Sequence, residues 1–120
     1  MKYLKLVFAS LFCLVSFVAS ADNELEPQHG GQVQEAHHLA FELVSENNEL
    51  QLYIRDHGTA YDLTNITGTI TILAQGERTQ HNWIRNEEFL SVEAEPLEAG
   101  DIIMVNLNRG QRNFAVRFRW

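Results

Sequence analysis

The chain has one cysteine and two lysines among its 120 residues, and all three lie close to its start. Lys2 and Lys5 precede residues 6–19, an uncharged apolar run that is too short to span a bilayer comfortably. Residues 19–21 (Ala-Ser-Ala) then supply a small-x-small cleavage site. These three features are typical of a secretory signal peptide, so we expect residues 1–21 to be removed on export to the periplasm.

The exported part of the chain would therefore lack both residue types. Cys13 falls within the apolar run, so this part would have no disulfide, no thiolate ligand and no thiol nucleophile. Its apolar core must hold the fold alone, although export would permit disulfides. The sequence has 9 Lys+Arg against 16 Asp+Glu. Because non-specific binding to phosphate backbones depends on clustered Lys and Arg, nucleic acid is excluded as a partner.

Patterns that carry catalysis are also missing. After the predicted signal the serines are Ser45 and Ser91, each expected within or at the end of a strand, and no Gly-x-Ser-x-Gly occurs. Gly30 and Gly31 precede a strand rather than a helix, so no helix N-terminus is expected beside them to hold a phosphate. We therefore expect that the protein is not an enzyme.

A period of two dominates the chain from Val33 onward, and turn residues recur about every ten positions. This pattern is typical of an all-β domain, either an immunoglobulin-like β-sandwich of about seven antiparallel strands or a small barrel. We place this domain at residues 31–120, after a flexible N-terminal segment at 22–30. Strands are expected at residues 32–36, 37–46, 50–55, 69–75, 78–85, 88–95, 101–108 and 112–120.

Three local expectations follow from this pattern. Asn47 and Asn48 should form a hairpin turn, because asparagine tolerates the positive φ that two-residue turns require. Residues 56–68 should form a longer polar connection. Residues 101–108 are almost continuously apolar, which predicts a central strand that is buried on both faces.

Histidine is the informative residue type in this sequence. Five histidines lie between positions 29 and 81, and imidazole is a suitable ligand for Zn²⁺ or Cu²⁺. His29 precedes two glycines and could bend toward the second strand, where His37 and His38 should point to opposite faces. One of these two could then join it as a ligand. His57 has Asp56 beside it, which could bind the metal or orient the imidazole.

A structural role for these histidines stays open beside the metal site, because a seven-residue spacing between two histidines is not a recognised zinc pattern. His81 lies on a polar strand and is a weaker candidate than the other four. Met104 is the single methionine after the predicted signal, so a thioether-rich site for Cu(I) cannot be built.

Several short motifs carry a resemblance to a known family. The motifs are His-Gly-Gly-Gln-Val at 29–33, Glu-Leu-Val at 42–44, Leu-Gln-Leu-Tyr-Ile-Arg-Asp at 50–56, Asp-Leu at 62–63, Gly-Thr-Ile-Thr-Ile-Leu at 68–73 and Leu-Glu-Ala-Gly at 97–100. Through them the chain resembles the small periplasmic β domain of adaptor (membrane-fusion) subunits in heavy-metal exporters of the resistance-nodulation-division type, and the related stand-alone exported proteins.

This resemblance implies a periplasmic β-sandwich without enzymatic activity that is associated with the export of divalent transition metals. The long helical hairpin and the lipoyl-like segments of the adaptors are absent from this sequence, which implies an accessory role beside an adaptor or pump component. The leading prediction is thus an exported accessory protein that binds or handles Zn²⁺ or Cu²⁺ in connection with metal efflux. The alternative is a non-metal protein-interaction domain of the cell envelope, in which an exposed edge strand pairs with a partner.

Overall fold

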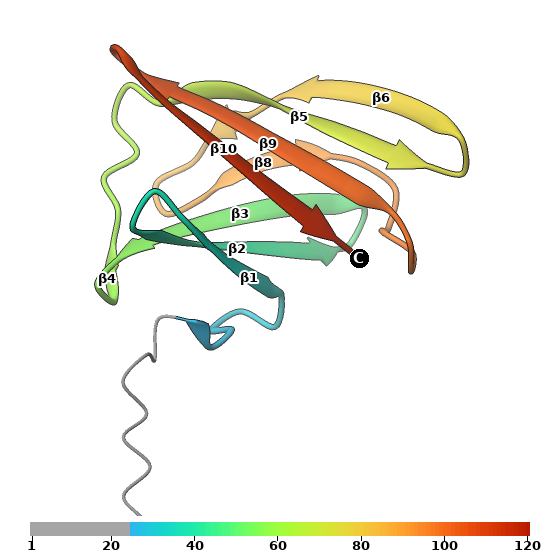
Figure 1. Cartoon of the computed structure of the whole chain (residues 1–120), viewed down its shortest axis with the longest axis horizontal. Coiled ribbons are helices and arrows are strands. Elements are labelled where there is room, and N and C mark those ends of the chain that lie inside the picture. The colour runs from blue at the N-terminus through green and yellow to red at the C-terminus, as the bar shows by residue number, and fades with distance from the viewer. Residues whose placement is uncertain (1–24) are drawn as a thin grey trace, which may run out of the picture.

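Two antiparallel β-sheets make up the fold of residues 25–120, the part of the chain that the computed structural model describes (Figure 1). Their inner faces pack on one shared hydrophobic core, so the predicted all-β sandwich is confirmed. The predicted signal peptide at 1–21, with Cys13, lies outside the described residues. Within residues 25–120, no helix has the length and apolar character needed to cross a bilayer.

Sheet A has the strand order β1-β2-β3-β8-β7, with β4 paired to β3, and sheet B has the order β10-β9-β5-β6. The strands of sheet A are β1 (Gln32–Ala36), β2 (Leu39–Glu46), β3 (Glu49–Asp56), β4 (Thr59–Ala60), β7 (Ile84–Arg85) and β8 (Leu90–Glu93). Those of sheet B are β5 (Thr67–Ala74), β6 (Glu77–Asn82), β9 (Ile102–Arg109) and β10 (Arg112–Arg119).

Tight two-residue loops join five of the pairs of consecutive strands. In four of them both central residues have positive φ, which matches the twist of the flanking strands. The Asn47-Asn48 turn between β2 and β3 is confirmed, with φ values of 52° and 58°. The other three loops are His37-His38, His57-Gly58 and Gln75-Gly76.

The predicted strand at 37–46 is wrong at its start. His37 and His38 have φ values of 54° and 65° and form the loop between β1 and β2, so β2 begins at Leu39. Histidine enters this left-handed region more readily than most residues, which lets it serve in a tight turn. The two imidazoles are therefore not placed on opposite faces of a strand.

The predicted strand at 78–85 is also corrected, because the chain changes sheets within it. Trp83 is buried at this corner, and its backbone N–H donates to the carbonyl of Gly68 at 3.0 Å. Before it, β6 pairs with β5 in sheet B, and after it, β7 pairs with β8 in sheet A.

The core lies between the two sheets and is built from every second residue along the strands, whose side chain points inward. β9 is central in sheet B, as predicted, but burial alternates along it and Met104 on its outer face is 43% exposed. The prediction that this strand is buried on both faces is therefore wrong. The largest fully buried apolar side chains are Phe41, Phe118, Leu43, Leu50, Leu52, Ile70, Leu90, Ile103 and Leu107.

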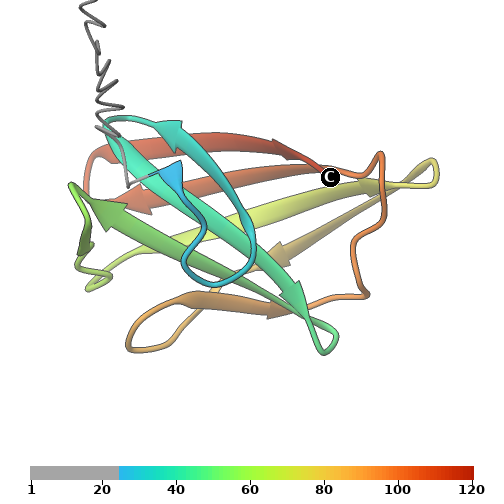
Figure 2. The same ribbon diagram turned by 90° about the horizontal axis from the view of Figure 1, so that it is seen from below.

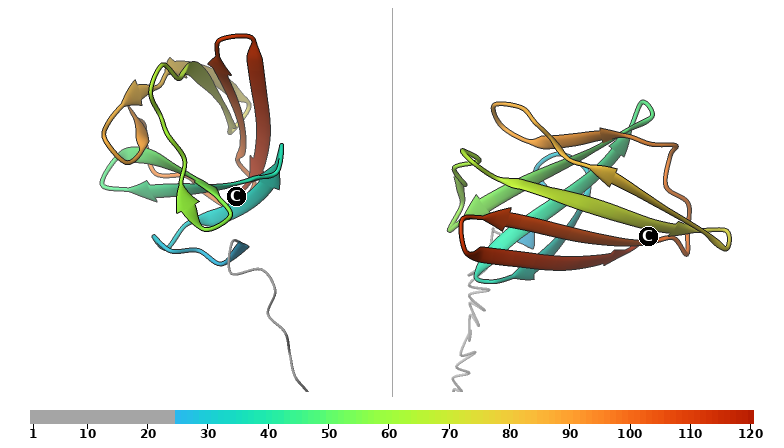
Figure 3. Two further views of the ribbon diagram at one scale, coloured as in Figure 1. Left: turned by 90° about the vertical axis from the view of Figure 1, so that its left-hand side faces the viewer. Right: turned by 90° about the horizontal axis from the view of Figure 1, so that it is seen from above.

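The two lateral sides of the sandwich differ. On one side, β1 at the edge of sheet A contacts β10 at the edge of sheet B (Figure 3). On the other side, β6 is the last strand of sheet B, and the connection from β8 to β9 passes between the sheets near the β5–β6 turn (Figure 2). The first side is closed by strand contact, and the second is lined by a connecting loop.

Candidate functional site

His29 lies in a segment that packs across the outer face of sheet A. Its imidazole stacks on the ring of Tyr53, with the ring centroids 3.6 Å apart and the planes 10° from parallel. Tyr53 in turn packs at a tilt against Phe89, at 5.3 Å between centroids. His29, the first of the predicted metal ligands in the sequence, is therefore engaged in an aromatic stack.

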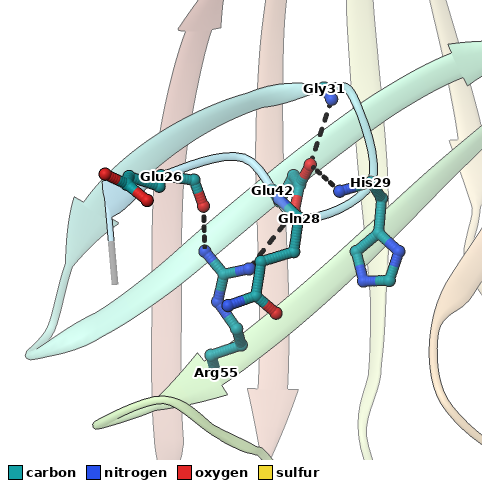
Figure 4. A network of polar contacts seen from close by, with 6 residues as sticks. All are labelled: Glu26, Gln28, His29, Gly31, Glu42 and Arg55. Carbon is teal, nitrogen blue, oxygen red and sulfur yellow. Dashed lines mark hydrogen bonds and ion pairs between the residues drawn. The ribbon is translucent and has the colours of Figure 1, made fainter. Parts of the chain in front are cut away.

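A buried carboxylate holds this segment in place (Figure 4). Glu42 on β2 is 1% exposed, and its two oxygens accept backbone N–H bonds from Gln28 at 3.0 Å, His29 at 2.8 Å and Gly31 at 3.0 Å. A Cβ on Gly31 would collide with the carbonyl oxygen of Leu43, so a glycine is required for this close approach. We call residues 26–31, which this carboxylate holds, the strap; most of it belongs to the segment at 22–30 that was expected to be flexible.

Arg55 on β3 completes the network from the other side. One guanidinium nitrogen lies 3.3 Å from a carboxylate oxygen of Glu42, and another donates to the carbonyl of Glu26 at 3.0 Å. Burial alone would raise the pKa of Glu42, but the three backbone donors and nearby His29 outweigh it and hold the pKa below its ordinary value. The carboxylate is therefore ionised and fully engaged in holding the strap.

This ion pair was not foreseen from the sequence, although a signal for it exists. The hairpin register places Glu42 opposite Tyr53 and Arg55 opposite Ala40, so the two charges are diagonal neighbours on one face. Two opposite charges at such a spacing around a recognised hairpin turn could have been read as a pair. Their burial could not, because it depends on the strap.

His37 serves the closed side of the sandwich. Its Nε2 accepts the backbone N–H of Ala115 on β10 at 3.1 Å, and its ring meets Phe114 edge-on at 5.5 Å between centroids. The Nε2 lone pair is thus used in a hydrogen bond. His37 and His29 also stand at opposite ends of β1, whose five residues span about 16 Å.

Among the predicted ligands, the structure brings together Asp56 and His57. The Nδ1 of His57 lies 2.6 Å from a carboxylate oxygen of Asp56, on an exposed turn, and His38 is exposed on the neighbouring turn. Across residues 25–120, no group of three or more His, Cys, Asp or Glu side chains is arranged to hold a metal ion.

A cleft of about 380 Å³ opens on the other side of the sandwich, between β6 and the connection that follows β8. Every second residue of β6 points its side chain into this cleft, from Glu77 through Thr79 to His81. The remaining lining residues are Ile72, Ala74, Gln75, Ala94, Glu95, Pro96, Leu97, Glu98 and Asp101.

The wall opposite β6 is fixed by hydrogen bonds. Ala94 donates its backbone N–H to the carbonyl of Asn48 at 3.1 Å, and Leu97 donates to the hydroxyl of Ser45 at 3.1 Å. Glu98 receives a bond from the side chain of Gln75 at 3.0 Å, which ties this wall to the β5–β6 turn. The cleft is therefore preformed rather than a gap between two loose segments.

The cleft has an apolar floor and an acidic rim. Ile72, Ala74 and Leu97 supply the apolar surface. The carboxylates belong to Glu77, Glu95, Glu98 and Asp101. None of the described residues that line the cleft is an arginine or a lysine. Its electrostatic potential is therefore negative, which favours a ligand that carries positive charge.

The backbone of β6 adds a directional feature. Because β5 and β6 are joined by a two-residue loop, the register implies that Glu77 and every second residue after it bond to β5. Arg78, Gln80 and Asn82 then direct their backbone N–H and C=O groups away from β5, toward the open edge. Such a row is a template for an added strand.

Comparison of the chain with protein-family models, with curated proteins and with solved structures finds no match.

Proposed function

We propose that the protein is an exported, non-enzymatic binding module of the cell envelope, which captures an extended segment of a partner protein as an additional strand beside β6. One observation carries this proposal: a preformed cleft runs along an edge strand whose outward backbone groups are available for pairing. An added strand would gain backbone hydrogen bonds from β6, and every second side chain would enter the cleft. Export rests on the signal-peptide pattern at residues 1–21.

The chemistry of the cleft defines the segment that fits. Alternate positions of the segment should carry small or branched apolar side chains that reach Ile72 and Leu97 on the floor. At least one position should carry a basic side chain for the carboxylates of Glu77 and Glu95. We therefore expect an extended, basic and partly apolar segment as the ligand.

Two of the predicted metal ligands have structural partners that support this function over metal handling. His29 stacks on Tyr53, and His37 accepts a hydrogen bond from Ala115. The role in Zn²⁺ or Cu²⁺ handling beside an efflux adaptor stays a prediction, and among its expected ligands Asp56 and His57 lie in direct contact. Calorimetric titration of the protein and of a His57→Ala variant with Zn²⁺ tests it separately.

The test of strand capture is fluorescence anisotropy with two labelled heptapeptides in which every second residue is threonine. The remaining positions, which would face the cleft, hold valine and lysine in one peptide and valine and glutamate in the other. We expect saturable binding of the lysine peptide and weaker binding of the glutamate peptide. Gln80→Pro removes one outward N–H from β6 while leaving the β5 ladder intact, because proline is tolerated on the solvent side of an edge strand. Loss of that donor should weaken binding about tenfold.

Gln80→Ala is the matched control, since it changes the same side chain and keeps the backbone donor. It should bind the lysine peptide as the wild type does. A second variant, Glu77→Gln with Glu95→Gln, should weaken the lysine peptide and reduce its sensitivity to salt. Equal affinity of the Gln80→Pro and Gln80→Ala variants for the lysine peptide would rule out pairing at this edge.

A further inference from the structure

The outer face of sheet B is positively charged, in a protein whose formal net charge is −7. The register aligns Arg119, Ile102, Leu73 and Arg78 in one row across all four strands. The adjacent row contains Arg117 and Met104, together with Thr71 and Gln80. Among the described strand residues that face outward on this sheet, none is an aspartate or a glutamate.

Apolar side chains lie at the centre of these rows. Leu73 is 38% exposed and Met104 is 43% exposed, and they are two of the four large exposed hydrophobic residues in the described chain. The three arginines flank them on β6 and β10. An apolar centre with a basic rim is the arrangement of a docking surface rather than of a solvated face.

The outer face of sheet A carries the opposite charge. Glu46 stands directly opposite Glu49, and Glu49 stands directly opposite Glu93, so three glutamates form a row across β2, β3 and β8. Like charges in directly opposite positions are destabilising. Glu49 accepts one bond from Gln51 at 2.7 Å, which does not remove the repulsion.

The carboxylates of this face also act on Tyr53, which lies among them. Burial raises the pKa of the Tyr53 hydroxyl, and the carboxylates of Glu42, Glu88, Glu46 and Glu49 raise it further. Among the described strand residues on this face, the counter-charge is Arg55, which is engaged by Glu42. The negative face of sheet A and the positive face of sheet B are therefore complementary in charge.

We propose that these two faces are the two halves of a head-to-tail contact between copies of this chain, in which the outer face of sheet B of one copy stacks on the outer face of sheet A of the next. Arg119 and Arg78 stand three strands apart in their row, about 14 Å at about 4.8 Å per strand, whereas Glu46 and Glu93 stand two strands apart, about 10 Å. The long arginine side chains can therefore reach the two outer glutamates when the sheets stack. The exposed Leu73 and Met104 are covered in the contact.

The symmetry of this contact determines the assembly. The surfaces on the two copies differ, so the contact is heterologous and each copy keeps one half available for another. A face of four strands and eight residues covers on the order of 500 Å², and the strap leaves only part of this area of sheet A open, so the contact is below the area typical of a stable interface. The assembly is therefore weak, open-ended and sensitive to salt.

The experiment is sedimentation velocity of the purified protein up to about 1 mM, at roughly 50 mM and 500 mM salt. We expect the weight-average mass to rise with concentration at low salt and to stay monomeric at high salt. Arg117→Gln with Arg119→Gln disables the sheet B half, and Glu49→Gln with Glu93→Gln disables the sheet A half. Each double variant alone should remain monomeric.

Mixing the two double variants provides the decisive measurement. Each contributes one intact half, so the mixture should form one-to-one dimers and no larger species. Arg85→Gln, which removes one exposed arginine outside both faces, is the control and should assemble as the wild type does. A wild type that stays monomeric throughout, including one that binds anionic vesicles instead, overturns the proposal, as does a mixture without dimers. Gln80→Pro should leave assembly unchanged, which separates this contact from strand capture.

Discussion

Side chains alternate between the inner and outer faces in both sheets, but two charged side chains are buried on the outer face of sheet A, whereas those on the outer face of sheet B are left uncovered. On sheet A, the strap covers part of the face, and Glu42 and Arg55 are buried beneath it at 1% and 5% exposure. On sheet B, Arg117 and Arg119 stand on a face that no described segment covers. The comparison shows that an outward-facing charge becomes a structural clamp only where another segment of the chain encloses it.

Removing the clamp should have the largest effect. Glu42→Ala eliminates the acceptor of three backbone N–H groups and the carboxylate partner of Arg55, which stays buried. Breaking a buried pair in this way typically costs about 3–5 kcal/mol. We expect the free energy of unfolding, measured in urea, to fall by that amount.

Glu46→Ala is the matched control, because Glu46 lies on the same strand and the same face but is exposed. Its effect on stability should stay within about 0.5 kcal/mol. If both variants unfold at the same urea concentration, the buried network contributes nothing and the contrast between the two faces is lost.

A smaller effect is expected when the strap is displaced but the ion pair is kept. Gly31→Ala introduces a Cβ against the backbone carbonyl of Leu43, which cannot yield as a flexible side chain would. Overpacking of this kind costs about 1–3 kcal/mol. Hydrogen exchange at the amides of Gln28 and His29 should accelerate in the variant, and unchanged protection there would show that Gly31 is not needed for the strap.

Acid should weaken sheet A through the same carboxylate. The folded-state pKa of Glu42 lies below the ordinary value of 4.5, so the group stabilises the fold above that value and the contribution is lost as pH falls through the folded pKa. Urea unfolding between pH 7 and pH 3 should show the stability difference between wild type and Glu42→Gln shrinking below about pH 4.5. A constant difference across this range would mean that Glu42 does not titrate with folding.

The fold was largely predictable because it depends on local patterns. Period-two alternation predicted the all-β sandwich, and Asn47-Asn48 marked a turn through its tolerance of positive φ. The errors occur where a tertiary feature overrides the pattern. His37 and His38 form a turn despite their strand-like setting, and β9 has one exposed face despite its apolar sequence.

The sites were less predictable, because they depend on what lies beside a residue in space. His29 and His37 are separated by only seven residues in the sequence, yet the whole of β1 lies between them. The cleft arises from a change of sheet at Trp83 and from the connection to β9, and neither alternation nor composition reveals such a crossing. The residues of the cleft were visible in the sequence, but their convergence was not.

The smallest change in stability is expected for a substitution on the uncovered outer face of sheet B. Arg117→Gln removes a charge from sheet B that contacts solvent, so the free energy of unfolding at low protein concentration should change by less than about 0.5 kcal/mol. A loss as large as that of Glu42→Ala would mean that the two faces do not differ as described. If the charge contributes little to the isolated fold but takes part in the contact between copies, urea unfolding at high protein concentration should reveal a larger difference between Arg117→Gln and the wild type.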